Sequence, residues 1–118
     1  MEIVNWLLLF ILILFLVNRM MPVQGVRQIT TIELKKKLKD QKIQFVDVRT
    51  PHEFKSNHIK GFQNIPLYEL TERIGELSKE KEIILICQSG MRSNKASKIL
   101  KKHGFPHVTN VKGGMNAW

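Results

Sequence analysis

The apolar positions of this sequence are distributed in two very different ways. Residues 3–17 read IVNWLLLFILILFLV, in which Asn5 is the only polar residue, whereas the remainder alternates short apolar runs with charged segments. A helix over residues 1–21 would be about 31 Å long at about 1.5 Å per residue, and a hydrocarbon core is about 30 Å thick. We therefore expect residues 1–21 to form an N-terminal transmembrane anchor and residues 22–118 to form one folded domain.

The charges that flank this apolar segment predict its orientation. Arg19, Arg27 and the lysines at 35–37 follow it, whereas the only charged side chain before it is Glu2. The positive-inside rule then places the N-terminus outside and the domain in the cytoplasm, as a single-pass membrane protein. A cleaved signal peptide is the alternative, but residues 18–22, NRMMP, contain no small-residue cleavage site. The single cysteine agrees with a reducing compartment.

The rest of the sequence predicts alternating strands and helices. The run IILI at residues 83–86 has no polar alternation, which is typical of a strand buried on both faces of a parallel sheet. Pro51 favours a helix start and Gly104 a helix end. We expect strands at 26–29, 43–48, 82–86 and 107–111, and a turn around another short strand at 61–66. Helices are expected at 32–39, from 51, at 67–77 and at 93–103. This order predicts an α/β domain with a mainly parallel central sheet and helices on both faces.

The segment CQSGMRS at residues 87–93 carries the candidate chemistry. It follows the most apolar strand and precedes a helix predicted to begin at Ser93, at the strand end where parallel sheets bind ligands. Gly90 allows the left-handed backbone of a tight loop, whose N–H groups and following helix dipole can hold an anion, and Arg92 can add a full charge. Such a loop would stabilise a thiolate or a persulfide anion at Cys87. The alternative is a buried, inert cysteine at the end of a strand.

The motif Cys-x-x-Gly-x-Arg-Ser after an apolar strand resembles the active-site loop of rhodanese-type sulfurtransferases. Three further stretches are similar to motifs of that family and occur in the family's order. They are Asp47-Val48-Arg49, the E-x4-H-I-x-G-x-x-N-I-P pattern of residues 53–66, and the pair Gly113-Gly114 followed by Trp118. The resemblance extends from about Val26 to the C-terminus, so it covers the whole predicted domain and implies a rhodanese-like fold.

The resemblance implies sulfur transfer without a cofactor. Cys87 would be the nucleophile, taking sulfane sulfur from a small anionic donor such as thiosulfate, forming a persulfide and passing the sulfur to a thiophilic acceptor. Because Cys87 is the only cysteine, that acceptor is an external thiol or a protein sulfur acceptor. The substrate-binding residues would be Gln88, Ser89, Gly90, Met91 and Arg92. Supporting residues would be Asp47 and Arg49, as a buried ion pair, and Ser93.

Other polar residues indicate little further chemistry. Glu53 and His58 are expected to make local hydrogen bonds, and the four histidines show no metal-ligand spacing, so no metal site is expected. The net charge is +9, but the lysines are scattered and lack the interleaved aromatic residues that stack bases. We expect no nucleic-acid partner, and we interpret the basic surface as solvated helix faces near an anionic membrane leaflet.

Two other functions are consistent with such a loop. A phosphatase or arsenate reductase also uses a cysteine with an anion-binding loop, but relatives that cleave phosphate have C-x5-R, whereas Cys87 to Arg92 is C-x4-R. A non-catalytic, membrane-tethered binding module is the other alternative. Family members that lose activity commonly lose the cysteine, which this chain retains.

Overall fold

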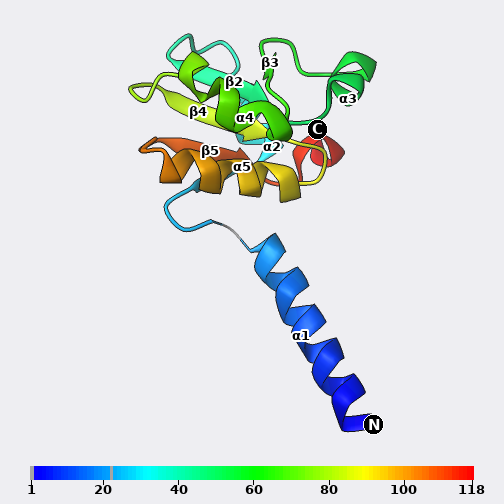
Figure 1. Ribbon diagram of the computed structural model, residues 1–118. Coiled ribbons are helices and arrows are strands. Elements are labelled where there is room, and N and C mark those ends of the chain that lie inside the picture. Colours follow the sequence, from blue (N-terminus) through cyan, green and yellow to red (C-terminus); the bar gives the residue numbers. More distant parts are fainter. Residues whose placement is uncertain (1, 22) are drawn as a thin grey trace.

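A long helix stands apart from a small α/β domain in the computed structural model, which describes residues 2–21 and 23–118 (Figure 1). Helix α1, Glu2–Met20, has 19 residues and follows the apolar segment. Residues 2–19 are exposed, and the stretch Glu2–Arg19 is long and apolar enough to cross a membrane. The helix therefore has the length and composition that the sequence predicted for a single span.

The domain is built on one five-stranded sheet. Its strands are β1 Arg27–Ile29, β2 Ile43–Asp47, β3 Gln63–Asn64, β4 Glu82–Ile86 and β5 Val108–Val111. They lie in the order β1-β5-β4-β2-β3, and every strand pair in the described residues is parallel. Asp47 and Ile86 are partners in the register of β2 and β4, so the segments that follow these two strands begin side by side.

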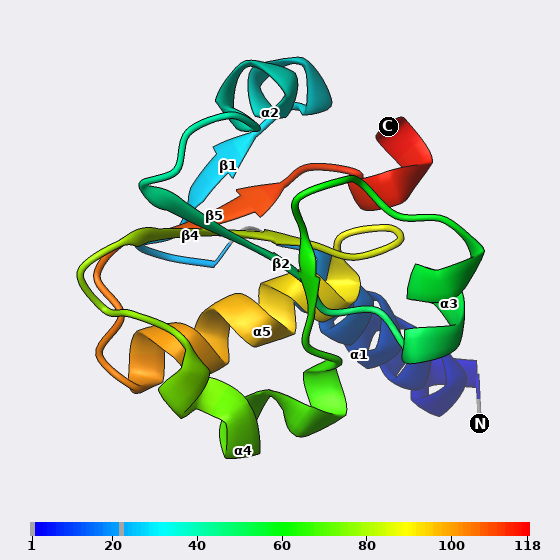
Figure 2. The ribbon, with the colours of Figure 1, turned by 90° about the horizontal axis from the view of Figure 1, so that it is seen from above.

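Helices cover both faces of the sheet, as expected (Figure 2). Helices α4 and α5 lie on one side, whereas α2 and the C-terminal turn η3 lie on the other. The helical segments are α2 Thr31–Lys37, α3 Pro51–Ser56, η1 Leu67–Glu69, α4 Leu70–Arg73, η2 Ile74–Glu76, α5 Met91–Lys102 and η3 Gly114–Ala117.

Strand β4 joins the two halves of the core. Ile83 and Leu85 pack on the side of α4 and α5, whereas Ile84 and Ile86 pack on the opposite side. This alternation follows from the two-residue period of a strand, and all four side chains are fully buried. The prediction of a central strand buried on both faces is confirmed. Cys87 continues the series on the α5 side.

The helices predicted at 93–103 and 67–77 differ from those observed. Helix α5 begins at Met91 and not at Ser93, because Gly90 already adopts a left-handed conformation as its N-cap. The helix expected at 67–77 is instead η1, α4 and η2 in succession. The apolar pairs Leu67 and Leu70, and Ile74 and Leu77, are each spaced by three residues, which matches the period of 3₁₀ turns.

Candidate active site

The thiol of Cys87 lies at the carboxyl end of β4, where the chain turns into α5. The residue is 1% exposed. Its Sγ accepts a hydrogen bond from the Gly90 N–H at 2.9 Å and lies 3.2 Å from the Ser93 hydroxyl oxygen. Gly90 has φ +111°, the left-handed conformation expected from the sequence. The loop therefore directs two hydrogen-bonding groups at the sulfur atom.

The hydroxyl of Ser93 can serve either protonation state of the thiol. Its oxygen also lies 3.1 Å from the carbonyl oxygen of Gly90. When Cys87 is neutral, its S–H can donate to the Ser93 oxygen while the hydroxyl donates to that carbonyl. When Cys87 is a thiolate, the hydroxyl can turn and donate to the sulfur instead. One hydroxyl rotation therefore lets the site accommodate either the neutral thiol or the thiolate.

The C-terminal turn η3 holds the loop from outside. The Met115 N–H donates to the Cys87 carbonyl at 2.8 Å, and the Asn116 N–H donates to the Gln88 carbonyl at 3.0 Å. Gly114 has φ +55°, and a Cβ atom there would lie 2.2 Å from the Cys87 carbonyl oxygen. Only glycine fits at this position, so Gly114 allows η3 to approach the loop backbone closely.

A buried ion pair lies beneath the loop. Asp47 and Arg49 approach to 2.8 Å, with side-chain exposures of 0% and 1%. Arg49 also donates to the Gln88 side-chain oxygen at 3.2 Å and to the Asn57 carbonyl at 2.7 Å. The predicted pair is therefore present, and it reaches the Cys87 loop through Gln88. Asn64 completes the arrangement by donating to the carbonyls of Asp47 and Arg49.

The guanidinium of Arg92 is bonded to Glu53. Two nitrogen atoms of Arg92 lie 2.6 and 2.9 Å from the two carboxylate oxygens of Glu53. These hydrogen bonds from Arg92 lower the pKa of Glu53 from 4.5 to about 2, and they raise the pKa of Arg92. The sequence predicted that Arg92 adds a full charge to the loop, but that charge is largely neutralised by a partner that the sequence analysis missed. Its role in substrate binding stays a prediction.

Glu53 and His58, which the sequence predicted to make only local hydrogen bonds, differ in the range of their contacts. The ring nitrogen Nδ1 of His58 lies 2.8 Å from the Phe54 carbonyl, as predicted. Glu53 does bond locally, to the N-cap residue Thr50, but it also holds Arg92 across 39 positions of the sequence. Among residues 2–21 and 23–118, no group of three or more His, Cys, Asp or Glu side chains could hold a metal ion.

A hollow of about 250 Å³ adjoins the loop. Ser89, Gly90 and Met91 form one side, and the remaining lining residues are Gln28, Asn94, Asn110, Lys112 and Gly113. Gln28 Nε2 and Asn110 Oδ1 are buried there without a hydrogen-bond partner in the described part of the chain. Both amide side chains belong to the lining of this hollow, which also includes the positive charge of Lys112.

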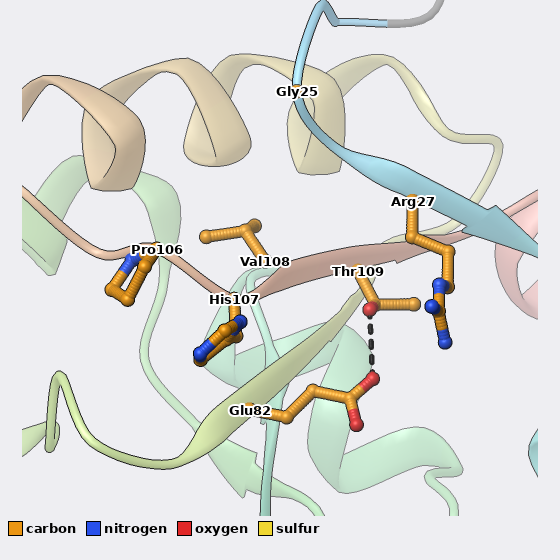
Figure 3. Close-up of a pocket in the computed structure, with 7 residues that line it drawn as sticks. All are labelled: Gly25, Arg27, Glu82, Pro106, His107, Val108 and Thr109. Atoms are coloured by element: carbon orange, nitrogen blue, oxygen red, sulfur yellow. Dashed lines mark hydrogen bonds between the residues drawn. The ribbon is translucent and has the colours of Figure 1, made fainter.

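A second hollow, of about 360 Å³, lies near the opposite ends of the strands (Figure 3). Glu82 there accepts a hydrogen bond from the Thr109 hydroxyl at 2.9 Å. The lining residues are Gly25, Arg27, Glu82, Pro106, His107, Val108 and Thr109, and none of them belongs to the predicted site. The predicted site residues instead gather around Cys87, so the loop after β4 is the candidate active site.

Comparisons with known proteins agree with this placement. Residues 30–118 match the model of the rhodanese-like domain family. The chain is 42% identical over 78 residues to the uncharacterized protein YqhL of Bacillus subtilis, covering 66% of this chain and 62% of YqhL. It is 37% identical over 71 residues to the thiosulfate sulfurtransferase PspE of Escherichia coli, covering 58% of this chain and 68% of PspE.

A solved structure gives the same result for the fold. The chain superposes on a rhodanese-like domain protein from Staphylococcus aureus with a TM-score of 0.73 and 36% identity, covering 79% of this chain and 91% of the other. The family model spans residues 30–118, which include β2 to β5 and the Cys87 loop. The chain therefore belongs to the rhodanese-like domain family, which includes sulfurtransferases.

Proposed function

We propose that this protein is a membrane-anchored sulfurtransferase that carries sulfur as a persulfide on Cys87. The observation that supports this most strongly is the pair of hydrogen-bonding groups, Gly90 N–H and Ser93 hydroxyl, directed at the sulfur of the chain's only cysteine. Both groups stabilise a negative charge on sulfur, which is the nucleophilic form of the thiol. Membership in a family that includes sulfurtransferases supports the same chemistry.

The proposed reaction has two steps. The Cys87 thiolate attacks the outer sulfur of thiosulfate, the S–S bond of the donor breaks, and sulfite leaves with the bonding electron pair. The product is a persulfide anion on Cys87. An acceptor thiolate then attacks the terminal sulfur, forms its own persulfide, and restores the Cys87 thiolate. Because no second cysteine exists in the chain, the acceptor is an external thiol or a protein.

The hollow beside the loop is the proposed entrance for the donor. Cys87 is almost completely buried, so a donor must approach through the loop residues, and Gly90 both lines this hollow and contacts the sulfur. Lys112 supplies a positive charge for an anionic donor. Thiosulfate fits these requirements, and the relative PspE is named for it.

Loop length and pairing favour sulfur transfer over phosphate chemistry. The four residues between Cys87 and Arg92 make a shorter loop than the five of phosphate-cleaving relatives. In addition, Arg92 is held by Glu53, which reduces the charge available for a dianionic phosphate group.

We propose that helix α1 anchors the domain on the cytoplasmic side of a membrane. The apolar length of α1 and the basic residues that follow it favour this arrangement.

An activity assay with a variant tests the proposed reaction. The detergent-solubilised full chain is expected to form thiocyanate from thiosulfate and cyanide, whereas Cys87→Ser forms none. Flotation with phosphatidylcholine vesicles tests the anchor separately. Hydrolysis of a phosphate ester without thiocyanate formation would favour the phosphatase alternative, and absence of both activities in a folded wild type would favour a binding module.

A further inference from the structure

A hollow lies between the membrane helix and the domain. Helix α5 is the element of the domain nearest to α1, and the two helices are in contact (Figure 1). The space between them is about 260 Å³. It is lined by Phe15, Asn18 and Arg19 of α1 and by Met91, Lys95 and Lys98 of α5. Three of these six side chains are cationic, and none is acidic.

The basic charge around this hollow is not balanced by nearby acids. Arg19, Lys95 and Lys98 form no ion pair with any carboxylate of residues 2–21 and 23–118. Helix α5 as a whole carries five basic residues and no acidic one. Lys95 and Lys98 are exposed and lie one turn apart, so they share a face of the helix. An anion placed between the two helices would therefore be attracted by three cations.

The position of the hollow along α1 indicates which anion fits. The apolar run of α1 ends at Val17, so Asn18 and Arg19 would lie at the level of lipid headgroups if α1 spans a bilayer. Phe15, one turn earlier, would lie on the hydrocarbon side. A soluble phosphate would use only the basic side of the hollow. A phospholipid would use both, with its phosphate at the cations and an acyl chain against Phe15.

We propose that the hollow between α1 and α5 is a binding site for an anionic phospholipid, whose headgroup phosphate contacts Arg19, Lys95 and Lys98. This site rests on the proposed membrane anchoring of α1. Met91 lines both this hollow and the one beside the Cys87 loop. A bound lipid would therefore hold α5 against the bilayer and turn the active-site entrance toward the membrane surface. Sulfur donors and acceptors at that surface would then reach Cys87 before those free in solution.

The test uses the full chain reconstituted in vesicles of phosphatidylcholine, with and without phosphatidylglycerol. The readout is acylation of individual lysines by an amine-reactive reagent, measured by mass spectrometry. We expect phosphatidylglycerol to reduce acylation of Lys95 and Lys98 by about fivefold or more, since each lysine near an anionic surface contributes about 1 kcal/mol. Lys36 of α2 and Lys39, two residues after the end of α2, serve as internal controls, because α2 lies on the opposite side of the sheet. Their acylation should not change.

A matched pair of variants completes the test. Lys95→Gln with Lys98→Gln should lose phosphatidylglycerol retained in native mass spectrometry, whereas Lys36→Gln with Lys39→Gln should keep it. Equal retention by both variants, or equal protection of Lys95 and Lys98 by soluble glycerol phosphate, would overturn the lipid site. Failure of the wild type to float with pure phosphatidylcholine would instead refute the anchor. Flotation without any phosphatidylglycerol effect would refute the lipid site alone.

Discussion

At the level of single residues, the Cys87 sulfur is contacted by two groups that each have one hydrogen to donate. The Gly90 N–H is fixed by the backbone, whereas the Ser93 hydroxyl can point either to the sulfur or to the Gly90 carbonyl. Because Ser93 is fully buried, we expect no water molecule to take the place of its hydroxyl when the side chain is shortened to alanine. Its contribution should therefore appear when the thiol reacts as an anion.

Ser93→Ala is expected to slow alkylation of Cys87 by iodoacetamide at neutral pH by about tenfold or more, because a hydrogen bond to a charged group contributes about 1.5–3 kcal/mol. The control is Ser97→Ala. Ser97 is equally buried on the same helix, but its hydroxyl donates to the Ser93 carbonyl and not to the sulfur. Equal alkylation rates for the two variants would show that the Ser93 hydroxyl has no special effect on the thiol.

The Glu53–Arg92 pair predicts a pH dependence of stability. Because the hydrogen bonds from Arg92 lower the pKa of Glu53 from 4.5 to about 2, the folded state favours the ionised carboxylate. The pair therefore stabilises the fold fully above about pH 4.5, and this stabilisation is lost as the pH falls toward about 2. Urea unfolding should show a difference between wild type and Glu53→Gln that shrinks across this range. The control variant is Glu80→Gln, because Glu80 is exposed and forms no ion pair within the described residues.

At the level of elements, the active-site loop is held between two structures. The turn η3 holds it from outside through the carbonyls of Cys87 and Gln88, and the Asp47–Arg49 pair holds it from beneath through the Gln88 side chain. The parallel register brings the end of β2 beside the end of β4, which places that ion pair under the loop. The position of the loop therefore depends on its contacts with both η3 and the Asp47–Arg49 pair.

Gly114→Ala should destabilise the domain by at least about 2 kcal/mol, since a left-handed alanine alone costs about 1–2 kcal/mol and its Cβ would overlap the Cys87 carbonyl. The matched control is Gly75→Ala, where a Cβ meets nothing within 4 Å. Its free energy of unfolding should change by less than about 1 kcal/mol. Similar urea midpoints for the two variants would contradict the close packing of η3 on the loop.

Asp47→Asn should lower the free energy of unfolding by about 3–5 kcal/mol, because it leaves the Arg49 charge buried without its partner. The matched control Glu76→Gln removes the charge of an exposed partner of Arg73, and it should lower the free energy of unfolding by only about 0–1 kcal/mol. Chemical denaturation of both variants measures the difference. A small loss for Asp47→Asn would mean that Arg49 finds another counter-charge.

Much of the fold followed from local patterns in the sequence. The unbroken apolar run before Cys87 predicted a central parallel strand, and Gly90 predicted a left-handed loop, because both depend on neighbouring residues alone. The segment 67–77 was misread because three- and four-residue apolar spacings overlap there. The sequence did not predict the ion pair between Glu53 and Arg92, because no sequence spacing relates residues that only tertiary folding brings together.

At the level of the whole molecule, the chain joins an exposed apolar helix to a rhodanese-like domain. The cytoplasmic location of the domain and the orientation of α1 stay predictions from flanking charge. The thiol is placed where the sheet, the loop and α5 meet, on the side of the domain that carries the basic helix. If α1 is anchored, sulfur transfer by Cys87 would take place close to the bilayer.

The most direct test of sulfur transfer is the intact mass of the full chain after incubation with thiosulfate, with Cys87→Ser treated in parallel. We predict that the wild type gains the mass of one sulfur atom, that cyanide removes it as thiocyanate, and that Cys87→Ser stays unmodified. A wild type that gains no sulfur from thiosulfate or from other sulfane donors, while iodoacetamide still labels Cys87, would contradict the persulfide mechanism.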